Sequence, residues 1–296
     1  MRQKLRQDFE FKAMGCPCKI SVCGDDPGTL DYVGKLALKE CLRLDRKYSR
    51  FISTSLINKI NAIAGSSTKL ELDSETSAII DFAYEAYSLS DGLFDISAGP
   101  LIRLWDHRIA KFPTPQQIVA QQQNVGLDNV IWDDGLLALP VPGMCIDLDG
   151  LVKEYAVDSM LQLIHRNGVN DVLINLGGDL RASGFDRSSQ EKGWSVHIQN
   201  PEQRDHSLLN MTLLNGALAT SGTLERGFEK NGQWFSHIIN PVTAKPVTRT
   251  YSSLTVKHDS CMMAGVLATI ALLKGKPAGD LWLTELGADF YINDLV

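Results

Sequence analysis

The sequence predicts an α+β fold in which helices pack on an antiparallel-rich sheet. Several segments place apolar residues at helical spacing, and others alternate apolar and polar residues as half-buried strands do. Consecutive strand-like segments are mostly separated by turn residues and not by helices, which argues against a doubly wound parallel sheet. With 296 residues, 44% of them hydrophobic, the chain can bury the core of one large domain or two smaller ones.

The N-terminal half is predicted to be mainly helical after an initial strand or hairpin. The expected elements are a strand or hairpin at 9–24, helices at 29–51, 55–64, 74–92 and 114–126, and a hairpin at 128–140. Asp73 or Ser74 would cap the third of these helices. We expect one region that spans 1–296, with a mainly helical sub-lobe around 75–125.

The C-terminal half is predicted to contain most of the strands. The expected elements are a strand at 144–150, a helix at 151–168, strands at 171–184, 194–201, 208–222, 234–241 and 251–258, helices at 261–275 and 277–287, and a last strand at 288–293. Turn residues, and not helices, separate most of these strands, so we expect antiparallel pairing.

Composition excludes some classes of partner. A formal net charge of −6 gives no support for binding nucleic acid, which calls for a basic face. The longest apolar runs fall short of the ~20 residues that a membrane span needs. The charged N-terminus contains no apolar signal region, so we expect a cytoplasmic protein with reduced cysteines, or a periplasmic one if a leader peptide has been removed. No feature of the sequence indicates an oligomeric state.

The segment around 144–153 carries the strongest chemical signal. A strand is expected to deliver Asp147, Asp149 and Gly150 to the start of a helix near Leu151, where free amides favour anions. Carboxylates favour a cation, and Lys153 in the first turn adds a charge directed at phosphate. This combination is typical of a magnesium–phosphate site, although an Asp at this place can also be a plain helix cap.

Two further segments could contact a ligand through small residues. Gly177 and Gly178 lie at a strand end, where paired glycines allow a close backbone approach and their amides can bind an anion. The alternative is a tight turn between two strands. Ser221 leaves another strand and is suited to a hydrogen bond with a ligand, but it lacks the G-x-S-x-G context of a nucleophile.

Three other residues are candidates for ligand contact or catalysis. His237 lies near a strand end before a proline-rich turn, where histidine is either a catalytic base or a structural residue. Phe94 and Asp95 lie in a loop between two expected helices, where an aromatic ring and a carboxylate could hold a heterocycle.

The apolar helix at 261–275 contains an unexpected gap. Gly265 lies inside the run, where glycine costs roughly 1 kcal/mol relative to alanine. Thr269 follows one helical turn later, so the gap and a hydroxyl share one face. Packing alone could explain this face, and a ligand site is the alternative.

Taken in order, these segments resemble the ApbE family of FAD:protein FMN transferases. The matching stretches are FKAMG, KYSRF, SLINKIN, DGLFDISAGPLIRLW, IDLDGLVKEYAVD, LINLGGDL, WSVHIQNP, ATSGTLERGF, SHIINPVTAKPV and AGVLAT. The resemblance implies a T-fold-like architecture that binds FAD and Mg²⁺. It also implies transfer of FMN from FAD to a Ser or Thr hydroxyl of an acceptor flavoprotein subunit, with release of AMP.

The resemblance implies roles for individual positions. They are flavin contacts from Met14 and Phe51, adenine or ribose contacts from Leu93, Phe94 and Asp95, FAD contacts from Asp147, Lys153 and Val247, Mg²⁺ contacts from the Gly150 carbonyl and Thr269, and deprotonation of the acceptor hydroxyl by His237. Gly177, Gly178 and Ser221 are expected to contact FAD as well.

The sequence departs from the family at the metal site. Gly265 stands where the family typically carries an Asp that binds Mg²⁺, and Ala268 stands where some members add a second acid. We expect Asp149 to compensate in part by approaching the cation from the opposite wall. Two alternatives to transfer therefore stay open: an FAD-binding carrier or assembly factor without transfer activity, and an FAD pyrophosphatase.

Overall fold

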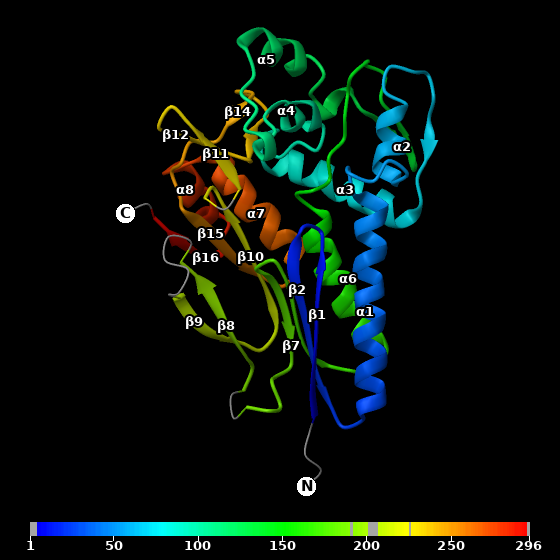
Figure 1. Cartoon of the computed structure of the whole chain (residues 1–296), viewed down its shortest axis with the longest axis vertical. Helices are drawn as coiled ribbons and strands as arrows, with labels where there is room; N and C mark the ends of the chain where they lie inside the picture. The colour runs from blue at the N-terminus through cyan, green and yellow to red at the C-terminus, as the bar shows by residue number, and fades with distance from the viewer. Residues whose placement is uncertain (1–4, 190–191, 201–206, 225, 295–296) are drawn as a thin grey trace.

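The computed structural model describes residues 5–189, 192–200, 207–224 and 226–294. At its centre is a seven-stranded sheet (Figure 1). Its strands are, in spatial order, β1 (Leu5–Ala13), β2 (Cys16–Gly24), β6 (Asp171–Leu176), β7 (Asp179–Ser183), β10 (Gly216–Gly222), β15 (Ser253–His258) and β16 (Asp289–Asn293). Every neighbouring pair is antiparallel. This pairing confirms the predicted fold class.

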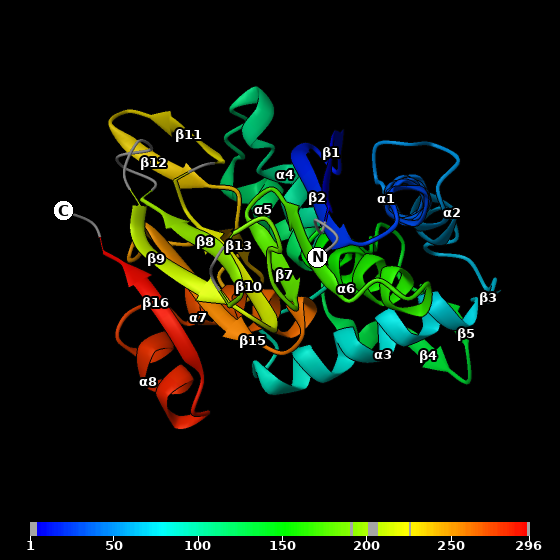
Figure 2. The same ribbon diagram turned by 90° about the horizontal axis from the view of Figure 1, so that it is seen from below.

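The helices of the described residues are α1 (Pro27–Tyr48), α2 (Leu56–Ala62), α3 (Ser74–Leu89), α4 (Gly99–Leu104), α5 (Pro115–Gln122), α6 (Val152–Arg166), α7 (Cys261–Lys274) and α8 (Ala278–Glu285), with 3-10 turns at His107–Ile109 and Leu127–Asn129. Of these, α1, α6 and α7 cover one face of the central sheet. α1 packs on β1 and β2, α6 on β6 and β7, and α7 on β10 and β15 (Figure 2). The main core lies between these helices and the sheet. Asp73 caps α3 by accepting a hydrogen bond from the Thr76 N–H, as predicted.

Four smaller sheets complete the fold. They are the hairpin of β8 (Trp194–Gln199) and β9 (Ser207–Leu213), the sheet of β3 (Leu70–Glu71), β5 (Leu136–Ala138) and β4 (Ile131–Asp133), and the pairs β11 (Gly227–Lys230) with β12 (Gln233–Ser236) and β13 (Ile239–Asn240) with β14 (Lys245–Pro246). The β8–β9 hairpin buries Trp194 and Val196 in a second core with Leu180 and Leu218 of the central sheet.

A third apolar cluster connects α4 to the β11–β14 segment. Leu101 and Trp105 pack with Phe228 and Ile239, and the Trp105 indole donates a 2.9 Å hydrogen bond to the Ala244 carbonyl. Figure 1 shows α4 and α5 together at one end of the molecule, whereas α3 contributes Ile79 and Ile80, among others, to the main core. The C-terminal part of α4 is thereby held against β11 and β13.

Several expected elements differ in the structure. The strands expected at 171–184 and 234–241 are each divided in two, into β6 and β7 and into β12 and β13. Residues 144–150 do not form a strand but make a single bridge, between Cys145 and Ala98, because the chain there pairs with the α3–α4 loop and not with a sheet. The expected strand 208–222 is two strands in different sheets, β9 and β10. The expected helix 29–51 ends at Tyr48, which leaves Phe51 in a loop. Pro201, at the end of the strand expected at 194–201, lies outside the described residues.

Among the residues that the structure describes, none of the helices is both long enough and apolar enough to cross a bilayer.

One buried carboxylate fixes α7 against α6. Asp158 of α6 accepts hydrogen bonds from the Ser260 hydroxyl (2.8 Å) and from the N–H groups of Cys261 (3.0 Å) and Met262 (3.1 Å). It also pairs with Arg181 of β7. These contacts satisfy free amides in the first turn of α7 and place negative charge at its positive end. Asp158 therefore sets which residues of the two helices face each other.

Removing this carboxylate should destabilise the whole fold. We expect Asp158→Ala to lower the free energy of unfolding by about 3 kcal/mol, because it leaves a partly buried guanidinium and a helix start without their partner. Asp31→Ala removes an exposed acid that pairs with Lys35 within α1 and should cost about 0.5 kcal/mol or less. Urea denaturation of both variants measures the difference, and similar losses in the two would contradict the assignment.

Candidate functional site

A cleft of about 1500 Å³ opens at one end of the central sheet. Its walls come from the start of β2, the β6–β7 turn, the end of β10, the α3–α4 loop, the start of α6, the middle of α7 and the segment around His237. Pockets for small ligands usually measure roughly 300–1,000 Å³. The cleft therefore has room for a dinucleotide and for part of a second reactant.

Most of the residues singled out in the sequence line this cleft. They are Phe51, Leu93, Phe94, Asp95, Asp147, Asp149, Gly150, Lys153, Gly177, Gly178, Ser221, His237 and Thr269. Met14 and Val247 lie beside the lining and are not part of it. The Met14 N–H donates to Asp45, and the Val247 N–H donates to the carbonyl of the lining residue Ile238.

The paired glycines form the turn between β6 and β7. Gly177 (φ 61°) and Gly178 (φ 99°) both adopt left-handed backbone conformations, which favour glycine. A Cβ at Gly177 would lie 2.8 Å from the Cβ of Cys16, whereas a Cβ at Gly178 would meet no described atom within 4 Å. The segment is thus the tight turn proposed as one alternative, and it also presents backbone to the cleft.

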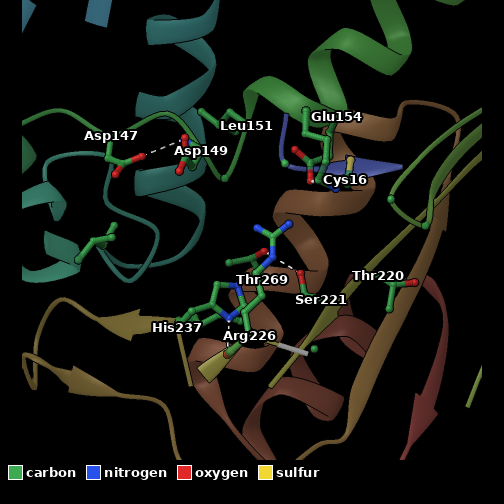
Figure 3. Close-up of a pocket in the computed structure, with 18 of the residues that line it drawn as sticks. Cys16, Asp147, Asp149, Leu151, Glu154, Thr220, Ser221, Arg226, His237 and Thr269 are labelled. Carbon is green, nitrogen blue, oxygen red and sulfur yellow. Dashed lines mark hydrogen bonds and ion pairs between the residues drawn. The ribbon is translucent and has the colours of Figure 1, made fainter. Parts of the chain in front are cut away.

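Arg50, which the sequence did not point to, holds two carboxylates in one wall of the cleft. Arg50 pairs with the buried Asp147 and, at 3.2 Å, with Asp149. The Asp149 N–H donates to the Asp147 carboxylate at 3.0 Å (Figure 3). Partial removal from water in the wall of the cleft and the negative charge of Asp147 raise the pKa of the Asp149 carboxyl to about 6. The positive charges of Arg50 and Arg226 act in the opposite direction, and the carboxyl stays half exposed to the cleft. Both acids are thus engaged within this wall.

Phe51 forms an aromatic surface at the mouth of the cleft. Its side chain is 60% exposed, although phenylalanine is usually buried. The Arg50 and Arg108 guanidinium carbons lie 4.9 and 4.5 Å from the ring centroid, at the distances of cation–π contacts. These contacts hold the ring where a flat ligand could stack on it.

The opposite wall carries more negative than positive charge. The Lys153 ammonium pairs with Asp179 and, at 3.2 Å, with Glu154. Asp179 also accepts a 3.0 Å hydrogen bond from the Thr220 N–H. One oxygen of the Glu154 carboxylate, Oε2, is buried without a hydrogen-bond partner among the described residues. One lysine therefore balances two carboxylates, with one oxygen of the pair still unpartnered.

Two hydroxyl groups meet at the floor of the cleft. The Ser221 hydroxyl of β10 and the Thr269 hydroxyl of α7 lie 2.9 Å apart, and either can donate to the other (Figure 3). Within the described ranges, no cluster of three or more His, Cys, Asp or Glu residues has the arrangement of a metal site. Mg²⁺ usually binds through one or two carboxylates, water and substrate phosphates. The hydroxyls and the unpartnered Glu154 oxygen fit that donor set.

His237 is held in one tautomer. Its Nδ1 lies 3.0 Å from the Arg226 carbonyl, which can only accept, so Nδ1 carries the proton and Nε2 is free to accept one. Burial of the ring, together with the charges of Arg226, His107 and Arg50, lowers its pKa to about 4. The imidazole is therefore neutral at pH 7 and can act as a base through Nε2.

Several charged residues that line the cleft were not singled out in the sequence, and three of them, Arg50, Glu154 and Arg226, bear on the proposed chemistry. Arg50 follows a helix, Glu154 directly follows Lys153, and Arg226 follows the segment that contains Ser221. Figure 3 shows the Arg226 side chain reaching into the cleft from the side of His237. Glu154 could have been found from its place in the first turn of an expected helix, next to Lys153, but only Lys153 was assigned a role in binding phosphate.

Comparison with known proteins identifies relatives along almost the whole chain. The family model described as "ApbE family" matches residues 14–292. The chain is 28% identical over 219 residues to the FAD:protein FMN transferase of Vibrio cholerae serotype O1, a match that covers 72% of this chain and 65% of that protein. It is 29% identical over 270 residues to the enzyme of the same description from Salmonella typhimurium, which covers 87% of this chain and 75% of that protein.

Solved structures share the fold. The ApbE protein from Thermotoga maritima superposes with a TM-score of 0.88 and 26% identity, over 97% of this chain and 94% of that one. The flavin transferase ApbE from Vibrio cholerae gives a TM-score of 0.86 at 22% identity, over 98% and 93% of the two chains. The mixed helical and antiparallel architecture is common to all three proteins.

The protonation of His237 can be measured directly. We expect its imidazole to keep the NMR shifts of the neutral ring from about pH 8 to about pH 5.5, because its pKa lies near 4. Since the unfolded chain binds this proton more readily, stability should fall as the pH drops from 6.5 toward 4, and by less in His237→Gln. The variant also assigns the resonance, and a His237 titration midpoint at pH 6 or above would contradict this description.

Proposed function

The chain belongs to the ApbE family, and we propose that it transfers FMN from FAD to a Ser or Thr hydroxyl of an acceptor flavoprotein, with release of AMP. The observation that carries this proposal is the neutral His237, whose free Nε2 faces the same cleft as Lys153, Arg226 and the Ser221–Thr269 hydroxyl pair. A base, two cations and oxygen donors in one cleft are what phosphoryl transfer to a hydroxyl needs. The relatives named FAD:protein FMN transferases support the choice of donor and acceptor.

The cleft offers complementary surfaces for FAD. We infer that the flavin stacks on the exposed Phe51 ring and that the diphosphate lies between Lys153 and Arg226. The Gly177 N–H donates to the Pro17 carbonyl and the Gly178 N–H to the Asn175 side chain, so this turn lets a ligand approach the backbone closely but offers it no free N–H group. The Phe51 ring suits a flat ring of the dinucleotide, and the two cations suit its diphosphate.

The transfer itself needs one bond made and one broken. The acceptor oxygen attacks the phosphorus of the FMN half of FAD, and the bond from that phosphorus to the bridging oxygen breaks. AMP leaves with the electron pair of that bond, and the hydroxyl proton passes to Nε2 of His237. Arg226, whose carbonyl orients the His237 ring, also extends its positive guanidinium into the cleft, where it would stabilise negative charge on the reacting phosphates.

Mg²⁺ fits the donor groups of the cleft. We infer that Thr269, with Ser221 beside it and the carbonyl of Gly150, would hold the ion. When bound, Mg²⁺ neutralises charge that develops on the phosphate oxygens. The protein's own part is to present oxygen donors at the floor of the cleft, next to the region assigned to the diphosphate.

The proposed reaction is tested by mass spectrometry of a Thr-containing acceptor peptide incubated with the protein, FAD and Mg²⁺, alongside an assay for AMP. We expect an added FMN group on the peptide and an equal amount of AMP. His237→Gln should lower the rate by roughly 10²-fold or more, because the hydroxyl then lacks its base. AMP without modified peptide would instead identify an FAD pyrophosphatase, and neither product with FAD tightly bound would identify a binding protein.

Phe51 should contribute to FAD affinity through its ring. We expect Phe51→Ala to raise the Kd for FAD roughly tenfold, the effect of losing an aromatic stacking contact of about 1 kcal/mol or slightly more. Phe185→Ala is the matched control, because Phe185 is also exposed and contacts an arginine, Arg187, but does not line the cleft. Quenching of flavin fluorescence measures both affinities, and equal values for the two variants would exclude stacking on Phe51.

A further inference from the structure

We propose that Glu154 of α6 is the carboxylate ligand of the divalent cation in this cleft, an inference that rests on the proposed function. The first observation is steric. A Cβ built on Gly265 of α7 would lie 2.7 Å from Cγ, 3.2 Å from Cδ and 3.4 Å from Oε1 of Glu154. The space where a side chain at position 265 would begin is therefore occupied by the Glu154 side chain, which would have to shift if position 265 also carried an acid.

The second observation is the unpartnered oxygen of this carboxylate. Glu154 is only 8% exposed, and Oε1 lies 3.2 Å from the Lys153 ammonium. Oε2 is buried and has no hydrogen-bond partner among the described residues. A buried carboxylate oxygen without a partner is costly to the fold. A bound cation would satisfy this oxygen.

The register of the two helices places the carboxylate near other oxygen donors. Asp158 of α6 meets Cys261 of α7, and Glu154, one turn earlier on α6, meets Gly265, one turn later on α7. The helices are thus antiparallel, and Thr269 lies one further turn along α7, about 5.4 Å on. Figure 3 shows the Glu154 side chain directed from α6 toward α7 and the cleft. One carboxylate and the Thr269 and Ser221 hydroxyls therefore face a common space.

Asp149, the carboxylate expected from the sequence to compensate for Gly265, lines the same cleft but already has a protein partner. It pairs with Arg50 and lies beside Asp147. The gap at Gly265 and the acid at Glu154 are then one feature: the glycine makes room for a carboxylate that comes from the neighbouring helix.

The test is Mn²⁺ binding in the presence of FAD, measured by electron paramagnetic resonance of the free ion. We expect Glu154→Gln, which keeps the shape of the side chain, to weaken Mn²⁺ binding by roughly tenfold or more. Glu85→Gln makes the same change at an exposed site on α3 and should leave it unaltered. Unchanged affinity in Glu154→Gln, or a larger loss in Asp149→Asn, would overturn the proposal.

An exchange of the two positions gives an independent readout. Glu154→Gly alone should weaken Mn²⁺ binding, and Gly265→Asp alone should weaken it and lower the melting temperature, because the new side chain overlaps Glu154. The double variant E154G/G265D should recover both properties, since one acid again faces the cation. Recovery of the melting temperature without recovery of Mn²⁺ binding would show that the pair matters only for packing.

The two proposals can fail separately. If the unaltered protein transfers no FMN while Glu154→Gln loses Mn²⁺ affinity, the proposed function fails and the ligand assignment holds. If the unaltered protein transfers FMN and Glu154→Gln binds Mn²⁺ normally, the ligand assignment fails and the proposed function holds.

Discussion

The antiparallel register between α6 and α7 is the constraint on which the cleft depends, and the buried carboxylate of Asp158 sets it. Asp158 binds the first amides of α7 and pairs with Arg181 of the sheet. Because helix residues one turn apart share a face, this one anchor also determines that Glu154 meets Gly265. The groups assigned to the cation are thus positioned by a contact that takes no part in binding it.

Each of the two walls of the cleft pairs one cation with two carboxylates. On one wall Arg50 engages Asp147 and Asp149. On the other wall Lys153 is shared between Glu154 and Asp179, and the Glu154 Oε2 atom has no hydrogen-bond partner among the described residues. This oxygen favours a cation beside α6 and α7, and Arg226 supplies a positive group for an anionic ligand. A metal–diphosphate pair matches both requirements.

Much of the fold and of the site was predictable, because local patterns determine them. The apolar helix at 261–275, the turn at Gly177–Gly178 and the antiparallel strands follow from spacing and turn residues. The segment 144–150 was wrongly expected to be a strand, since its partner is a loop and not a sheet. The contact between Glu154 and Gly265 joins residues more than a hundred positions apart, so no local pattern contained it. From the sequence alone, Asp149 was therefore the acid expected to compensate for the missing carboxylate at position 265.

The most direct test of this account is an anomalous diffraction map from crystals grown with FAD and Mn²⁺. We expect one Mn²⁺ peak within about 2.0–2.4 Å of both a Glu154 carboxylate oxygen and the Thr269 hydroxyl, next to the diphosphate of FAD. A peak coordinated by Asp149, with Glu154 bound only to Lys153, would contradict it.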